Sequence, residues 1–244
     1  LWVSSADYRD EMSVSDDILK RASDGYRRIR NTVRFLLGNM AGFDPAEHMV
    51  AGEDMLALDA WAVAKAHSLQ LEIDEAYKAY QFHGVQQKIH HFCALDLGGF
   101  YLDIIKDRLY TTKPDSLARR SAQTAMFHIV EYLVRWLAPI TSFTADEIWS
   151  FLPGERAESV FLAEYYQGGA DILPPENMGM DFWSQITDVK QAVNKAIEVE
   201  RNEGKVKGGL TTNVILYADN GVKALVDALE DEAKFVFMVS GIHV

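Results

Sequence analysis

A stretch of twenty residues, Ile18 to Leu37, constrains the fold of this chain most strongly, because it has the pattern of one long amphipathic helix. At about 100° per residue, seven apolar residues fall on one side of that helix: Ile18, Ala22, Tyr26, Ile29, Val33, Leu36 and Leu37. Such a side becomes stable when it is buried against other helices. The stretch therefore predicts a helical bundle organised around it.

The same stretch carries an unusual concentration of positive charge. Six of the 24 lysines and arginines lie between Lys20 and Arg34, in a chain whose formal charge is −12. Arg27, Arg30 and Arg34 are spaced i, i+3, i+7, which aligns them along one flank of the apolar side. Two interpretations are open. The arginines contact the phosphates of a nucleic acid, or they pair with acidic neighbours and cover apolar surface with their stems.

The position of this flank gives a more specific expectation. Because the flank borders the buried side, at least one of the three arginines should be partly buried and paired with a carboxylate such as Asp146 or Glu147. The helix should end near Gly38 and Asn39, which leaves Phe43 in the following turn. Phe43 either covers the end of the bundle or provides a surface on which an unpaired base stacks.

Helical periodicity continues through most of the chain. Four more long helices are expected, over about 54–80, 82–108, 116–137 and 181–202. Gly98 and Gly99 weaken the second of these. A capping box at Thr144 to Glu147 predicts a short helix that ends before Pro153. Helices in this order, joined by short turns, predict an antiparallel bundle.

The composition changes after the bundle. Leu210 to Ala218 is rich in β-formers, and we expect it to pair with a second strand near Phe235 to Val239, with the intervening helix packed on one face. The prediction is a mostly α protein that ends in a small α+β unit. Its four parts are a lead-in (1–15), a helical bundle (16–152), an irregular connection (153–180), and a long helix with the small α+β unit (181–244).

Composition excludes several classes of protein. No window approaches about 18 uninterrupted apolar residues, so we expect no membrane span. The first residue, Leu1, is not Met and no cationic signal-peptide start follows it, which favours a piece of a longer protein. Cys93 is the only cysteine, which excludes an intrachain disulfide and is typical of a reducing compartment. We therefore expect a cytoplasmic chain.

No catalytic site is evident in the sequence. The run GKVKGG lacks the glycine spacing and the terminal Lys-Ser/Thr of a phosphate-binding loop. His83, His90, His91 and Cys93 lie close together, but a single cysteine without a CxxC pair does not make a zinc site. We assign no catalytic residue, no metal ligand and no cofactor to this chain.

Three runs carry a resemblance to a known family. YRRIRNTVRFLLGN (Tyr26 to Asn39) resembles the first helix of the anticodon-binding domain of isoleucyl-tRNA synthetases, of the bacterial, class I type. FYLDIIKDRLY (Phe100 to Tyr110) and LAPITSFTADEIW (Leu137 to Trp149) resemble the same domain further on, in the same order and at similar spacing. ARRSAQTAMFHI (Ala118 to Ile129) fits between them. The resemblance covers almost the whole chain.

The resemblance implies that the chain binds the anticodon region of a tRNA, whose unpaired bases can be splayed out and read. Arg27, Arg30, Arg34 and Phe43 are then the candidate tRNA-binding residues. The expected partner is tRNA(Ile), with no DNA and no membrane, and the chain is expected to be a monomer.

For the parent enzyme, the resemblance implies the joining of isoleucine to its tRNA with ATP and Mg²⁺. The family's zinc-binding module would lie beyond Val244. Two alternatives stay open: the corresponding domain of a valyl-, leucyl- or methionyl-type synthetase, and a helical protein-interaction scaffold whose arginines are structural.

Overall fold

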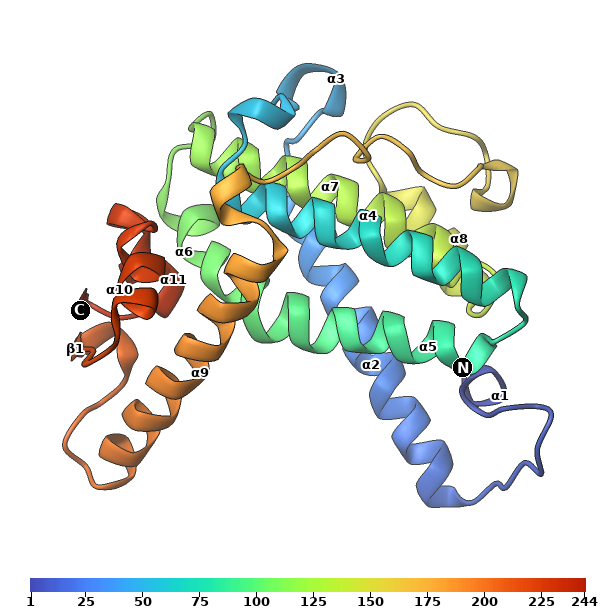
Figure 1. Ribbon diagram of the computed structural model, residues 1–244. Helices are drawn as coiled ribbons and strands as arrows, with labels where there is room; N and C mark the ends of the chain where they lie inside the picture. Colours follow the sequence, from blue (N-terminus) through green and yellow to red (C-terminus); the bar gives the residue numbers. More distant parts are fainter. The chain divides into compact units, whose positions relative to one another are not determined.

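The computed structural model describes residues 1–244 and confirms a mostly helical chain with one small sheet. The chain forms two units, Leu1–Pro174 and Pro175–Val244. Figure 1 shows the helices of the first unit from α1 to α8 and those of the second from α9 onward. None of the helices combines the length and the apolar character needed to cross a membrane.

Helix α2, Asp16–Asn39, confirms the amphipathic helix that the sequence predicts and begins two residues before it. Ser15 caps its start, because the Ser15 hydroxyl accepts a hydrogen bond of 3.3 Å from the backbone N–H of Ile18. Asp16 and Asp17 add negative charge in the first turn, where the helix dipole favours it. The buried side of α2 carries Ile29, Val33 and Leu36.

Helix α7, Leu117–Leu137, forms the centre of the first unit. Nearly all of its residues from Ser121 onward are buried, since α2, α4, α6 and α8 pack around it together with the short α3. The other elements of this unit are α1 (Trp2–Ser5), α3 (Pro45–His48), η1 (Gly52–Asp54), α4 (Ala57–Lys78), α5 (Phe82–His91), η2 (Phe92–Tyr101), α6 (Leu102–Thr111), α8 (Ser142–Phe151) and η3 (Val160–Leu162).

The expected helix over 82–108 is continuous through α5, η2 and α6, but its middle third is wound as a π-helix. A π turn has its hydrogen bonds from i to i+5, which accommodates a wider turn. Gly98 and Gly99 lie in this segment, and a Cβ atom at Gly98 would stand only 3.0 Å from the carbonyl oxygen of Cys93. The helix therefore changes its winding in the segment that holds the two glycines and does not end there.

A buried carboxylate joins four elements of the bundle. Asp59 on α4 is fully buried and accepts hydrogen bonds from the Tyr101 hydroxyl (2.8 Å) and the Ser121 hydroxyl (2.6 Å). Arg108 on α6 lies 3.4 Å from the same carboxylate. Because a buried charge is stable only when it is paired and hydrogen-bonded, this network fixes the position of α4 against η2, α6 and α7.

The start of α8 differs from the sequence prediction. The helix begins at Ser142, so the expected capping box from Thr144 to Glu147 is wrong. The Thr144 side chain has a different partner: its hydroxyl shares a hydrogen bond of 2.9 Å with the Tyr26 hydroxyl on α2. The Thr144 hydroxyl therefore makes a contact between helices and does not cap α8.

The second unit contains α9 and the small sheet. Its elements are η4 (Glu176–Met178), α9 (Met180–Asn202), η5 (Gly209–Thr211), β1 (Asn213–Ile215), α10 (Asn220–Asp227), η6 (Glu230–Glu232), α11 (Ala233–Phe237) and β2 (Gly241–His243). The two strands are parallel, with Asn213 opposite Gly241 and Ile215 opposite His243.

The predicted strand near Phe235 to Val239 is wrong, because Ala233–Phe237 forms helix α11. Ala233, Val236 and Phe237 are buried at helical spacing, and a short apolar run does not by itself distinguish a helix from a strand. Met238 then takes a left-handed conformation, with φ of 56°, and ends the helix. The strand that pairs with β1 follows this turn.

Candidate nucleic-acid interface

Six cationic side chains of α2 form what we call the basic surface of α2: Lys20, Arg21, Arg27, Arg28, Arg30 and Arg34. All six are exposed. Arg27 pairs with Asp24 at 3.3 Å, in a pair that is largely open to solvent, and the other five have no carboxylate within ion-pair distance. Internal pairing therefore accounts for one of these charges only.

The expectation that one arginine of the stripe is buried and paired with Asp146 or Glu147 is wrong. Asp146 accepts a hydrogen bond from Ser159 instead, at 2.6 Å, and Glu147 is exposed. The reason is that an uncharged residue, Tyr26, occupies the position of α2 that meets α8. Arg27, Arg30 and Arg34 lie further round the helix, where they face solvent.

Phe43 lies in the turn between α2 and α3, as expected, and only 4% of its surface is exposed. Its ring packs against Phe127 and His48, at centroid distances of 6.1 and 6.2 Å. The next residue, Asp44, caps α3 by accepting a hydrogen bond of 2.9 Å from the backbone N–H of Ala46. Phe43 therefore covers the end of the bundle, and its stacking on a base stays a prediction that would require the ring to leave this packing.

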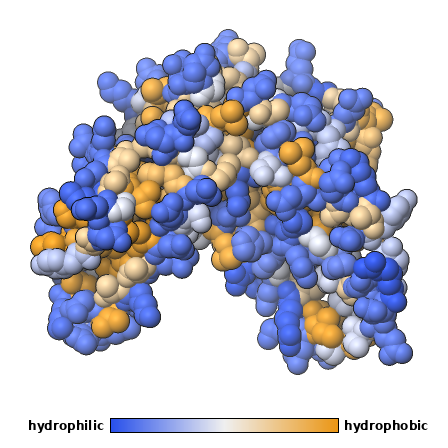
Figure 2. All heavy atoms as spheres, in the orientation of Figure 1, coloured by the Kyte–Doolittle hydropathy of each residue, from blue (hydrophilic) through white to orange (hydrophobic).

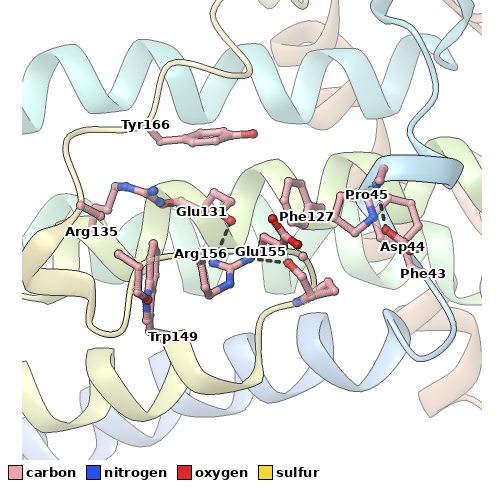
Figure 3. Close-up of a pocket in the computed structure, with 15 residues that line it drawn as sticks. Phe43, Asp44, Pro45, Phe127, Glu131, Arg135, Trp149, Glu155, Arg156 and Tyr166 are labelled. Carbon is pink, nitrogen blue, oxygen red and sulfur yellow. Dashed lines mark hydrogen bonds and ion pairs between the residues drawn. The ribbon is translucent and has the colours of Figure 1, made fainter.

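Phe43 also lines a pocket of about 860 Å³ that sequence reasoning did not find. Figure 3 shows its charged centre. The carboxylate of Glu131, on α7, lies 2.5 Å from an Nη atom of Arg135 and 3.1 Å from one of Arg156. The Glu131 side chain is 6% exposed, and the two arginine side chains are 13% and 14% exposed. The cluster thus holds two guanidinium groups against one buried carboxylate.

Aromatic rings complete the walls of this pocket. The guanidinium of Arg135 lies 4.9 Å from the ring centre of Trp149 and 5.2 Å from that of Tyr166. Arg156 lies 4.7 Å from the same Trp149 ring, and the Trp149 indole donates a 2.7 Å hydrogen bond to the carbonyl of Ala157. These cation–π contacts and hydrogen bonds fasten the irregular segment after α8 to α7 and α8.

Tyr166 also contacts a buried histidine. Its hydroxyl lies 2.7 Å from Nδ1 of His128 on α7. Burial lowers the pKa of His128 to about 4 and raises the pKa of Tyr166, so both side chains are neutral near pH 7. The only sequence signal for the pocket is the i, i+4, i+8 spacing of Phe127, Glu131 and Arg135 on α7, because its other residues come from other parts of the chain.

The four metal-ligand candidates do not come together. Nowhere do three or more His, Cys, Asp or Glu side chains converge in a way that could hold a metal ion. Cys93 is buried, and this burial raises the pKa of its thiol to about 12. Two features are the candidates for a binding site: the exposed cations on α2 and the pocket around Glu131.

Comparison with known proteins identifies the class to which this bundle belongs. The family described as the anticodon-binding domain of tRNA ligase matches residues 59–216, so the chain belongs to this family. This confirms the fold and the resemblance that the sequence indicates.

The relatives are more specific. The chain is 54% identical over all 244 residues to isoleucine–tRNA ligase of Marinomonas sp. (strain MWYL1), and 56% identical over the same length to that of Klebsiella pneumoniae (strain 342). It is 57% identical over 240 residues, 98% of the chain, to that of Alcanivorax borkumensis. The chain spans only 26% of the length of each of these relatives.

Proposed function

We propose that this chain is the tRNA-binding module of an isoleucine–tRNA ligase and that it binds the anticodon region of tRNA(Ile). The observation that carries this proposal is the basic surface of α2, where five of six exposed cations have no carboxylate partner. The family match and the identity to isoleucine–tRNA ligases support it.

The arginines of this surface contact the RNA backbone. A guanidinium presents a rigid fork of N–H donors that matches a phosphate, and Arg27 to Arg34 span about 10 Å at a rise of 1.5 Å per residue. The negative total of −12 does not prevent this, since exposed charges beyond about 10 Å are largely screened at moderate salt. Backbone contacts fix the orientation of the RNA and carry no sequence information themselves.

The activity of the parent enzyme lies outside this module. Ligation of isoleucine to tRNA uses ATP and Mg²⁺ in the parent, and the residues of this chain do not fit a nucleotide site, because they include no phosphate-binding loop. The module acts as a monomer in the cytoplasm, and any zinc belongs to another part of the parent.

The test is a titration of the chain with tRNA(Ile), tRNA(Val) and tRNA(Met) at several salt concentrations. We expect tRNA(Ile) to bind most tightly, with log K falling linearly as log salt rises. Preference for tRNA(Val) or tRNA(Met) would assign the module to another synthetase type. Absence of binding at about 50 mM salt, where phosphate contacts are strong, would favour the protein-interaction scaffold.

A further inference from the structure

The pocket around Glu131 contains a cationic donor group that the chain itself does not satisfy. Arg135 donates through Nε to the carbonyl of Glu164 (2.6 Å), and through Nη1 to the carbonyl and the carboxylate of Glu131. Its other terminal nitrogen, Nη2, has no hydrogen-bond partner and is not enclosed by the protein. Because Arg135 lines the pocket, this nitrogen is available to a ligand there.

The same pocket holds a carboxylate without a partner. Glu155 is exposed, forms no ion pair and accepts no hydrogen bond, and it lines the pocket together with Arg135 and Arg156. In the view of Figure 3, Glu155 lies between Arg156 and Phe127. The other exposed carboxylate of the lining, Asp44, already caps α3. The pocket therefore offers one unsatisfied cationic group and one unsatisfied anionic group.

Apolar residues form much of the remaining lining. Phe43, Phe127, Pro45 and Pro153 line the pocket beside these charges. Its volume of about 860 Å³ falls within the range of small-molecule sites, in which apolar walls surround a few polar groups that fix the ligand. Figure 2 shows that hydrophobic residues on the face in view lie among hydrophilic ones, as is normal for a protein surface. The pocket is therefore the better place for a small ligand.

The two unsatisfied charges discriminate between kinds of ligand. A simple anion is attracted by Arg135 and repelled by Glu155, whereas a simple cation is attracted by Glu155 and repelled by the guanidinium groups. A zwitterion satisfies both, because its carboxylate matches the fork of N–H donors on a guanidinium and its ammonium donates to a carboxylate. Such charge-assisted hydrogen bonds are about twice as strong as neutral ones.

We propose that this pocket binds a zwitterion with an apolar side chain, an amino acid or a short peptide, whose carboxylate accepts from Nη2 of Arg135 and whose ammonium donates to Glu155. The apolar side chain packs against Phe127 and the two prolines of the lining. No residue of the basic surface of α2 lines the pocket, so this inference does not depend on the proposed function.

The test measures binding of phenylalanine, 3-phenylpropanoate and 2-phenylethylamine to the full chain by ligand-observed NMR. The three compounds share one apolar body, but the second lacks the ammonium and the third lacks the carboxylate. Loss of a hydrogen bond to a charged group weakens binding by about 10- to 150-fold, so phenylalanine should bind at least about tenfold more tightly than either. Glycylphenylalanine, whose two charges lie further apart, shows by its affinity whether a peptide fits better than an amino acid.

A charge-removing variant locates the site. Glu155→Gln should bind phenylalanine about tenfold or more weakly and should bind 3-phenylpropanoate more tightly, because the repulsion is gone. Its fold should be unaffected, since Glu155 has no partner within the chain. Glu158→Gln is the matched control, because Glu158 is exposed in the same segment and does not line the pocket.

Three results would overturn the proposal. The first is that neither phenylalanine nor glycylphenylalanine binds. The second is that 3-phenylpropanoate binds the unchanged chain as tightly as phenylalanine does, which would indicate a site for simple anions. The third is that Glu155→Gln and Glu158→Gln bind phenylalanine equally well, which would place the binding site elsewhere.

Discussion

His128 is a buried residue whose protonation couples pH to the packing of the bundle. Burial lowers its pKa to about 4 in the folded chain, whereas the pKa of an unfolded histidine is about 6.5. The unfolded state therefore takes up the proton first as pH falls. The stability that His128 contributes is complete above about pH 6.5 and is lost as pH falls toward 4, by about 3 kcal/mol in total.

Urea unfolding at pH 7 and at pH 4.5 checks this, with the His128→Gln variant as the control. The carboxylates of the chain also titrate in this range, so the informative quantity is the difference between the two proteins. We expect the unchanged chain to lose more unfolding free energy than the variant on acidification. Equal losses would contradict the coupling.

Glu131 supplies the only negative charge within ion-pair distance of Arg135 and of Arg156. Replacement by alanine leaves two mostly buried guanidinium groups without a counter-charge, and we expect it to cost about 3–5 kcal/mol of unfolding free energy. Glu131→Gln keeps the shape and one acceptor oxygen, so its cost should be smaller. Asp103→Ala is the control, because the Lys106–Asp103 pair is exposed and such pairs contribute little. If Glu131→Ala were as stable as the control, the Glu131–Arg135–Arg156 cluster would not stabilise the fold.

At the scale of elements, the π segment gives a matched pair of glycine substitutions. A Cβ at Gly99 would stand 3.5 Å from the Ala94 carbonyl, an ordinary contact, whereas one at Gly98 would stand 3.0 Å from that of Cys93. Gly→Ala in a helix usually stabilises by about 0.5–1 kcal/mol. We expect Gly99→Ala to show this gain and Gly98→Ala to lose it or to destabilise, as measured by thermal unfolding. The reverse order would contradict the winding described for η2.

Local signals predict some elements of this fold well. The period of Ile18 to Leu37 and the hydroxyl at Ser15 identify α2, since both act within the helix itself. Ser116 caps α7 in the same way. The start of α8 and the helical state of α11 escape prediction, because Thr144 bonds to Tyr26 of α2 and does not cap its own helix, and a short apolar run such as Ala233 to Phe237 does not distinguish a helix from a strand.

In the candidate site, too, local spacing predicts some features, whereas others depend on the tertiary fold. Helical spacing identifies the stripe of Arg27, Arg30 and Arg34 and places it beside the buried side of α2, but it does not show that Tyr26 takes the position next to α8. The pocket around Glu131 is assembled by tertiary folding from the turn between α2 and α3, α7, α8 and the segment after α8. No spacing within the sequence could bring Arg156 and Tyr166 to that point.

In the molecule as a whole, the basic surface of α2 lies within an acidic chain. The formal charge of −12 disfavours RNA binding at long range, so the proposed function requires local contacts between arginines and phosphates. Such contacts have a quantitative signature, because each releases counter-ions from the RNA.

The most direct test is the salt dependence of tRNA(Ile) binding by the Arg30→Ala/Arg34→Ala double variant, with Lys106→Ala as a control for loss of an exposed, ion-paired cation. We predict weaker binding and a slope of log K against log salt reduced by about 0.7–0.9 for each lost phosphate contact, with thermal stability almost unchanged because both side chains are exposed. The control should keep the slope of the unchanged chain. Full affinity and an unchanged slope in the double variant would show that the arginines of α2 do not contact RNA.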